Sequence, residues 1–157
     1  MHRAIVILAA IGLALTTVGA AQAAELGGRV VLSCTGPLFA AAERGDPRAQ
    51  TTIGFMHETG RCLPQDYMLA AAWYQRAAQQ GYPRAQQLLG LLYDKGQGVA
   101  EDYVTAHVWL NLAAAGAAGR EREYYLRLRN SVGFKMTVAQ ITEAQWRARH
   151  WRPTPTP

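Results

Sequence analysis

Small and apolar residues recur every three or four positions in two adjacent stretches of the chain, which is the spacing of one face of an α-helix. The first stretch runs from about Pro83 to Asp94, and the second begins at Asp102. The two stripes are Ala85, Leu89 and Tyr93 in the first stretch and Ala106, Trp109 and Ala113 in the second. We therefore expect a hairpin of two helices, in which small residues around one large indole allow close packing.

The turn between these predicted helices carries two glycines, Gly96 and Gly98. Glycine adopts positive φ freely, so this pair can end the first helix and reverse the chain. Asp102 then lies where a carboxylate can accept hydrogen bonds from the N–H groups that open the second helix. A Gly-x-Gly segment can also enclose a phosphate, but in dinucleotide-binding proteins it follows a strand, and here it follows a helix. We interpret it as a turn.

The whole hairpin pattern is repeated at an offset of 36 residues, because residues 49–84 align with residues 85–120 without a gap. The matched pairs include Ala49 and Ala85, Ile53 and Leu89, Gly54 and Gly90, His57 and Tyr93, Asp66 and Asp102, Ala70 and Ala106, and Trp73 and Trp109. Residues 37–48 form a half repeat, since the pattern from Ala41 to Ala49 returns from Ala77 to Ala85. A period of this length is typical of helical solenoids.

Two more helices are predicted after the repeats. The first runs from Arg120 to Val132 and is broken near Gly133. Thr137 and Gln140 form a capping box that opens the second, which extends to about His150. The apolar face of this last helix consists of Ile141, Ala144 and Ala148. Because two full repeats leave an apolar end uncovered, we expect these helices to cap the stack.

The N-terminal residues have the features of a signal peptide. A short basic start is followed by an apolar run from Ala4 to Ala20, and Ala21-Gln22-Ala23 fits the small-x-small cleavage rule. The alternative is an uncleaved membrane anchor, although the run is short for a membrane span. We expect cleavage after Ala23 and export to a bacterial periplasm. The predicted order is a signal peptide over residues 1–23, a lead-in over 24–36, the repeat region over 37–119, capping helices over 120–151 and a disordered tail over 152–157.

Cys34 and Cys62 are the only cysteines of the chain. In an oxidising compartment an even pair usually forms a disulfide, and closing a loop of this length would stabilise the fold by roughly 3–4 kcal/mol. A reactive thiol pair and a lipid-modified Cys34 are the alternatives. His57 and Cys62 could be half of a zinc site, but the pattern lacks two further ligands. We therefore expect a structural disulfide, and neither a metal nor a cofactor.

Positive charge is concentrated near the C-terminus. Residues 120–152 contain eight Lys or Arg and three Glu, an excess of +5, whereas residues 24–119 have an excess of −1. Such a region could attract an acidic partner or an anionic polymer of the cell envelope, but it also suits a solvated helix face. Binding of nucleic acid is not expected of an exported chain.

The second repeat reads Ala-x-x-x-Leu-Gly-x-x-Tyr-x-x-Gly-x-Gly-Val-x-x-Asp-x-x-x-Ala-x-x-Trp-x-x-x-Ala-Ala from Ala85 to Ala114. This pattern resembles the Sel-one-like repeat, a relative of the tetratricopeptide repeat. The first repeat departs from it at His57 and Cys62, so its turn need not have the same geometry. Residues 135–151 also resemble a terminal segment often found in such proteins. The resemblance implies an all-α, right-handed stack of helical hairpins that binds other proteins, usually without catalysis.

By the same resemblance, one face of the first helix in each repeat lines a concave groove. Residues that recur at the 36-residue offset build the stack, whereas residues that differ at exposed positions are free to select a partner. The candidates are the positions opposite the apolar stripe of these helices, namely Arg48, Thr51, Phe55 and Glu58 in the first repeat and Arg84, Gln87, Leu91 and Asp94 in the second. Apolar side chains flanked by charges suit a peptide anchor in a polar rim, although Phe55 and Leu91 would also suit packing between helices.

No arrangement of catalytic residues is recognisable in the sequence. Asp66 and Asp102 occupy equivalent places in separate repeats, which favours helix caps over acid–base chemistry. Trp73 and Trp109 could stack on a sugar, but their recurrence favours core packing. We therefore expect an exported, monomeric, non-enzymatic adaptor for a protein or peptide. The alternatives are a cell-wall or β-lactam hydrolase, as reported for cysteine-rich members of the family, and an electrostatic binder of an anionic envelope polymer.

Overall fold

The computed structural model describes residues 36–154. The chain divides into two compact units, Met1–Gly36 and Pro37–Pro157, and the second is described here by itself. The predicted signal peptide, the lead-in before Gly36 and Cys34 lie outside the described residues, and so do residues 155–157. The expectations for those segments, including the disulfide between Cys34 and Cys62, therefore stay predictions.

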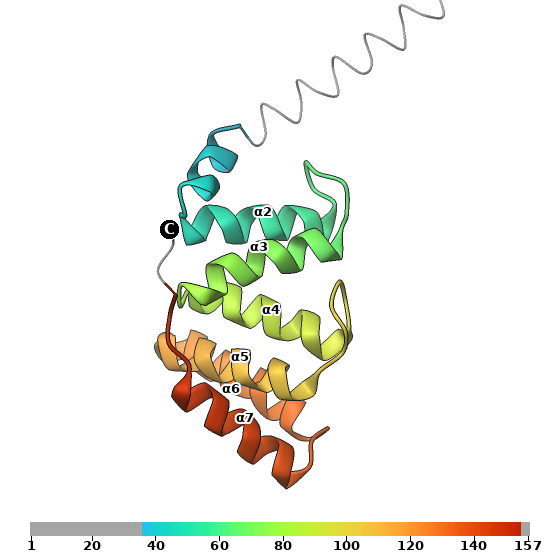
Figure 1. The fold of residues 1–157 in the computed structure, drawn as a ribbon, viewed down its shortest axis with the longest axis vertical. Coiled ribbons are helices and arrows are strands. Elements are labelled where there is room, and N and C mark those ends of the chain that lie inside the picture. The colour runs from blue at the N-terminus through green and yellow to red at the C-terminus, as the bar shows by residue number, and fades with distance from the viewer. Residues whose placement is uncertain (1–35, 155–157) are drawn as a thin grey trace, which may run out of the picture. The chain divides into compact units, whose positions relative to one another are not determined.

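The second unit is built from helices, which follow the chain from blue-green to red in Figure 1. Residues 36–43 are helical, and the helices after them are α2 (Pro47–Thr59), α3 (Tyr67–Gln79), α4 (Pro83–Lys95), α5 (Tyr103–Gly116), α6 (Gly119–Gly133) and α7 (Val138–His150). No strand occurs between residues 36 and 154. The predicted all-α fold is confirmed, and the helix ends predicted for α4, α6 and α7 lie within one residue of those observed.

Successive helices pack side by side as a stack of hairpins (Figure 1). Helix α2 contacts α3, α3 contacts α4, α4 contacts α5, and α5 contacts both α6 and α7. The last two helices therefore cover the end of the second repeat, as expected of a cap. Val108 of α5 is buried with Ala144 and Ala148 of α7, and Leu110 of α5 is buried with Val132 of α6.

Two equivalent glycines allow the helices within each hairpin to approach closely. A Cβ atom added at Gly54 would lie 2.6 Å from two ring carbons of Tyr74. A Cβ atom at Gly90 would lie 2.9 Å from Cγ of Leu110 and 3.1 Å from the carbonyl oxygen of Ala106. Real side chains do not approach so closely, so both positions need glycine.

The turns of the two repeats have the same backbone conformation. Gly60 and Gly96 end their helices with φ values of 70° and 63°. Cys62 and Gly98 follow with φ values of 64° and 69°. The cysteine thus adopts the left-handed conformation that its glycine counterpart adopts, and the departure at Cys62 does not change the turn. Gly98 has a further constraint, because a Cβ atom there would overlap the carbonyl group of Tyr67.

Buried glutamines link each repeat to the helix before it. The Nε2 atom of Gln50 donates to the carbonyl oxygen of Ala42 at 3.0 Å, and the Nε2 atom of Gln86 donates to that of Ala78 at 3.1 Å. Both side chains are buried. The two bonds are related by the repeat offset, so they are part of the stacking geometry, a role that we did not predict from the sequence.

Polar side chains cap the helices where the sequence predicts. Asp66 accepts two backbone N–H groups at the start of α3, and Asp102 accepts the backbone N–H of Thr105 at 3.0 Å. Thr137 and Gln140 form the predicted capping box of α7. Partial burial raises the pKa of Asp102, but hydrogen bonds from Thr105 and from the backbone outweigh this effect and hold the pKa below its usual value.

The residues after α7 return along the stack to the preceding repeat. The Trp151 ring packs edge-on against the Trp109 ring, with centroids 6.2 Å apart. Thr154 then donates its backbone N–H to the carbonyl oxygen of Gln79 at 2.9 Å. We expected a disordered tail over residues 152–157, but its described part, residues 152–154, is held against α3 by this bond. Figure 1 shows this segment in dark red beside the ends of the central helices.

Candidate binding groove

Four of the eight candidate groove residues lie around one pocket between the first helices of the two repeats. Its volume is about 210 Å³. Its lining consists of Arg48, Thr51, Thr52 and Phe55 from α2, Tyr82 immediately before α4, and Arg84 from α4. Helices α2 and α4 are in contact, although α3 lies between them in the chain. The stacking of repeats therefore creates this pocket, and neither repeat contains it alone.

Phe55 is the apolar side chain of the pocket. It is 38% exposed and does not belong to any of the core clusters among the described residues. A partner that covered it would remove apolar surface from water, which is favourable by about 25 cal/mol per Å². Leu91, the second apolar candidate, is half-buried on α4 and does not line the pocket.

Two arginines supply positive charge at the pocket. Arg48 and Arg84 are both exposed, and neither forms an ion pair within residues 36–154. A guanidinium without an acidic partner can accept a carboxylate in a two-pronged geometry. The charge of Arg84 also affects the pKa of the buried tyrosines Tyr74 and Tyr125. Burial and a hydrogen bond to an acid raise the pKa of each phenol, and Arg84 opposes that rise.

The two acidic candidates have partners within the protein. Glu58 accepts the hydroxyl hydrogen of Tyr74, with 2.5 Å between the oxygens. Asp94 forms an ion pair with Lys135 of the loop before α7, with 2.8 Å between Nζ and Oδ1. Each carboxylate therefore binds a neighbouring element of the protein. Neither forms an ion pair with Arg48 or Arg84.

Thr51 and Gln87 are less open than we expected. Thr51 is 3% exposed and donates its hydroxyl to the carbonyl oxygen of Pro47, and Gln87 is 6% exposed. The physical reason is the stack itself, because a helix inside a solenoid has neighbours on two sides and keeps only a narrow outward face. The groove candidates on the surface are therefore mainly the arginines and Phe55.

Tyr82 lines the pocket but was not among the predicted groove residues. It precedes Pro83 and is the counterpart of Asp46, which caps α2 by accepting from the N–H groups of Arg48 and Ala49. Tyr82 makes no such capping bond. Tyr82 differs from its equivalent residue, as most of the other candidates do, and this difference could have identified it.

The residues considered for metal binding or sugar stacking make contacts within the fold instead. They are His57, Trp73 and Trp109. The Nδ1 atom of the buried His57 lies 3.2 Å from the carbonyl oxygen of Pro64, across the first turn. Trp73 packs edge-on against Phe39, with centroids 6.0 Å apart, and Trp109 is buried in the central core cluster. Within residues 36–154, no three His, Cys, Asp or Glu side chains are close enough to hold a metal ion together. None of the described helices is long and apolar enough to cross a bilayer.

Comparison with known proteins identifies the repeat. The sequence profile of the Sel1 repeat matches residues 47–82 and 83–117, which correspond to the hairpins α2–α3 and α4–α5. A Sel1 repeat protein from Oxalobacter formigenes is 39% identical, with a TM-score of 0.54, and the match covers 66% of this chain and 84% of that one. The chain belongs to the Sel1 repeat family.

The chain is also similar to a second solved structure. It is a protective antigen present in uropathogenic Escherichia coli strains, and it displays an SLR fold. The sequence identity is 31%, the TM-score is 0.67, and the match covers 73% of this chain but 24% of the antigen. The chain thus spans about a quarter of the length of that protein. A search of curated proteins found no match. Sel1 repeats generally form protein-interaction scaffolds, and this chain has the repeat scaffold of that family.

Proposed function

We propose that this Sel1 repeat protein is an exported, non-enzymatic scaffold that binds a protein or peptide partner in the groove between α2 and α4. One observation carries the proposal. The exposed ring of Phe55 lies in the same pocket as Arg48 and Arg84, which have no acidic partner among the described residues.

The chemistry of the pocket favours an extended segment with an apolar anchor and nearby carboxylates. A volume of about 210 Å³ suits one side chain better than a whole small molecule. The anchor would cover Phe55, and carboxylates on either side would pair with the two arginines. The charge of Asp94 is paired with that of Lys135, so Asp94 adds little repulsion toward an acidic partner.

Crosslinking in cells tests the proposal, with mass spectrometry to identify what the tagged protein captures. We expect one recurrent partner, and we expect Phe55→Asp to lose it because a charge would replace the apolar contact. Met68→Asp is the matched control, since Met68 is 71% exposed on α3 and does not line the pocket. Circular dichroism should show the same helicity for both variants. Equal capture by Phe55→Asp and Met68→Asp would contradict the groove assignment.

Export is the second part of the proposal, and it rests on the sequence of residues 1–23. We expect the protein in the periplasmic fraction to begin at Ala24, because Ala21-Gln22-Ala23 fits a signal-peptidase site. Sequencing of the N-terminus after cell fractionation measures this directly. An intact N-terminus in the membrane fraction would support the uncleaved anchor and contradict cleavage.

A second candidate function is attachment to an anionic polymer of the cell envelope. One observation favours it, namely that several exposed arginines near the C-terminus form no ion pair within the described residues. They are Arg120, Arg122, Arg127, Arg149 and Arg152. Such binding should weaken steeply as salt rises, because salt screens exposed charges. Retention of the protein on immobilised polyglutamate, measured against salt, tests this, and salt-insensitive retention would contradict it.

A further inference from the structure

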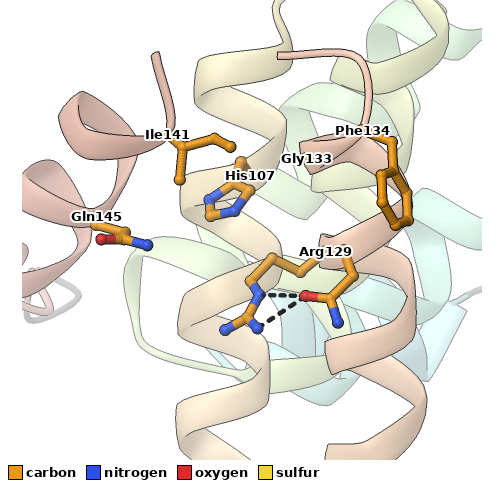
Figure 2. Close-up of a pocket in the computed structure, with 7 residues that line it drawn as sticks. His107, Arg129, Gly133, Phe134, Ile141 and Gln145 are labelled. Atoms are coloured by element: carbon orange, nitrogen blue, oxygen red, sulfur yellow. Dashed lines mark hydrogen bonds between the residues drawn. The ribbon is translucent and has the colours of Figure 1, made fainter. Parts of the chain in front are cut away.

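A separate pocket lies where the two capping helices meet the last helix of the repeats (Figure 2). Its volume is about 340 Å³, which is within the range of small-molecule sites. Its lining consists of His107 from α5, Arg129, Asn130 and Gly133 from α6, Phe134 after α6, and Ile141 and Gln145 from α7. None of these seven residues lines the groove between α2 and α4, so a ligand site here is independent of the function proposed for that groove.

Arg129 brings a positive charge to this pocket, and no acidic side chain among the described residues pairs with it. Its Nε and Nη2 atoms donate to Oδ1 of Asn130 at 3.2 and 2.8 Å, and its Nη1 atom donates to Oδ1 of Asn111 at 3.0 Å. Both acceptors are neutral amides. A guanidinium has five N–H groups, so two of them have no partner among the described residues. The side chain is thus oriented by its amide partners while its charge is not neutralised.

His107 is the buried polar group of the pocket. It is 5% exposed, and its Nδ1 atom is buried with no hydrogen-bond partner among the described residues. Burial, and then the charge of Arg129, lower the pKa of this imidazole, so the ring is neutral at pH 7. A neutral imidazole has one donor and one acceptor nitrogen. A buried donor without an acceptor is the costlier arrangement, so we assign the proton to Nε2, the nitrogen nearer to Gly133.

The remaining lining is apolar or neutral. Phe134 is 91% exposed at the rim, Ile141 is half-buried, and Gln145 adds an amide. None of the described residues that line the pocket is acidic. In Figure 2 the side chains of Arg129 and His107 come from neighbouring helices, with Phe134 and Ile141 on either side of His107. Donors beside an apolar rim match a ligand that has a carboxylate at one end and an apolar group at the other.

We propose that the pocket between α5, α6 and α7 binds a small carboxylate that carries an aromatic or aliphatic group. Arg129 would hold the carboxylate through its two remaining N–H groups, and Nε2 of His107 would donate a further hydrogen bond. Phe134 and Ile141 would cover the apolar part. The ligand could be a free hydrophobic acid or the C-terminus of a peptide, since both present the same group.

Calorimetric titration with N-acetylphenylalanine tests the proposal, with N-acetylphenylalaninamide as the uncharged probe. We expect the acid to bind at least about tenfold more tightly than the amide, because charged hydrogen bonds are the stronger ones. Arg129→Gln should remove this preference. Arg127→Gln should leave it unchanged, because Arg127 is exposed on the same helix but does not line the pocket. Equal binding of acid and amide, or no binding at ~10 mM of either, would overturn the proposal.

A second variant keeps the test valid if Arg129→Gln fails to fold. Phe134→Ala removes a 91% exposed side chain and should leave the melting temperature unchanged, while affinity for N-acetylphenylalanine falls by about fivefold or more. Unchanged affinity would contradict the placement of the apolar group. A short peptide ending in phenylalanine distinguishes the two sources, because tighter binding than that of the single acid indicates a chain terminus and equal or weaker binding indicates a free acid.

Discussion

At the residue scale, Gly90 shows how packing outweighs helix propensity in this stack. Replacing glycine by alanine inside a helix normally stabilises it by about 1 kcal/mol. A Cβ atom at Gly90, however, would lie 2.9 Å from Cγ of Leu110, which is fully buried and cannot move away freely. Overpacking of a core costs about 1–3 kcal/mol, so the steric cost is the larger effect.

We therefore expect Gly90→Ala to lower the free energy of unfolding by about 1 kcal/mol, measured by urea denaturation. Gly133→Ala is the control, because the nearest atom to a Cβ there is 3.8 Å away, which is ordinary contact. That control should be neutral or slightly stabilising. A stabilised Gly90→Ala variant would mean that α4 and α5 are not packed as closely as described.

Asp102 supports a prediction about pH. Its native pKa lies below the usual value, so the charged cap adds stability above the pKa of the unfolded chain, and this contribution is lost as pH falls through the native pKa. Asp102→Ala should lower the free energy of unfolding by about 1 kcal/mol at pH 7. The difference from wild type should shrink as the pH is lowered below 3.8, the ordinary value. Denaturation at pH 7 and near pH 2 checks this, and a difference that grows with acidity would contradict it.

At the element scale, the helix boundaries could be predicted because their signals are local. Gly96 ends α4, Asp102 opens α5, and the capping box at Thr137 opens α7. Each of these signals acts within a few residues of the end that it sets. The 36-residue offset then allowed the helices predicted for the second repeat to be assigned to the first repeat as well. The turn at Cys62 has the same left-handed backbone conformation as the turn at Gly98, although the residue differs.

The side-chain contacts between elements could not be predicted in the same way. Asp94 was placed in the groove, but it pairs with Lys135, 41 residues away. Thr51 and Gln87 were placed on an open face, but they are buried. These outcomes depend on how neighbouring hairpins stack, which no local pattern specifies. Phe55 and the arginines of the groove were identified because they lie opposite the apolar stripe of their helices, on the narrow face that the stack leaves exposed.

Gln86 gives a prediction at the same scale. It is 2% exposed and donates to the carbonyl oxygen of Ala78, so its side chain joins α4 to the end of α3. Gln86→Ala should lower the free energy of unfolding by at least about 1 kcal/mol, because a buried hydrogen bond is lost. Gln145→Ala, at an exposed position of α7, is the control and should change stability by less than ~0.5 kcal/mol. Equal effects in thermal denaturation would argue against a role for Gln86 in stacking.

At the scale of the whole described unit, the residues after α7 join the cap to the repeats. Trp151 packs on Trp109 of the second repeat and lies 3.7 Å from where a Cβ at Gly81 would be. Trp151→Ala should lower the free energy of unfolding by about 1–2 kcal/mol, from lost aromatic contact and apolar burial. Arg152→Ala, at the exposed neighbouring position, should have little effect. Identical melting curves for the two variants would show that the segment does not support the stack.

The proposed partner-binding role also belongs to this scale, because the groove exists only where two repeats meet. A photoreactive amino acid placed at residue 55, in the pocket, and separately at residue 68, on α3, tests it in living cells. We expect one discrete adduct with an envelope protein from position 55 and none from position 68, and loss of the adduct when Arg48 and Arg84 are both replaced by Glu. The same adducts from both positions, or none from position 55, would contradict a partner-binding groove between α2 and α4.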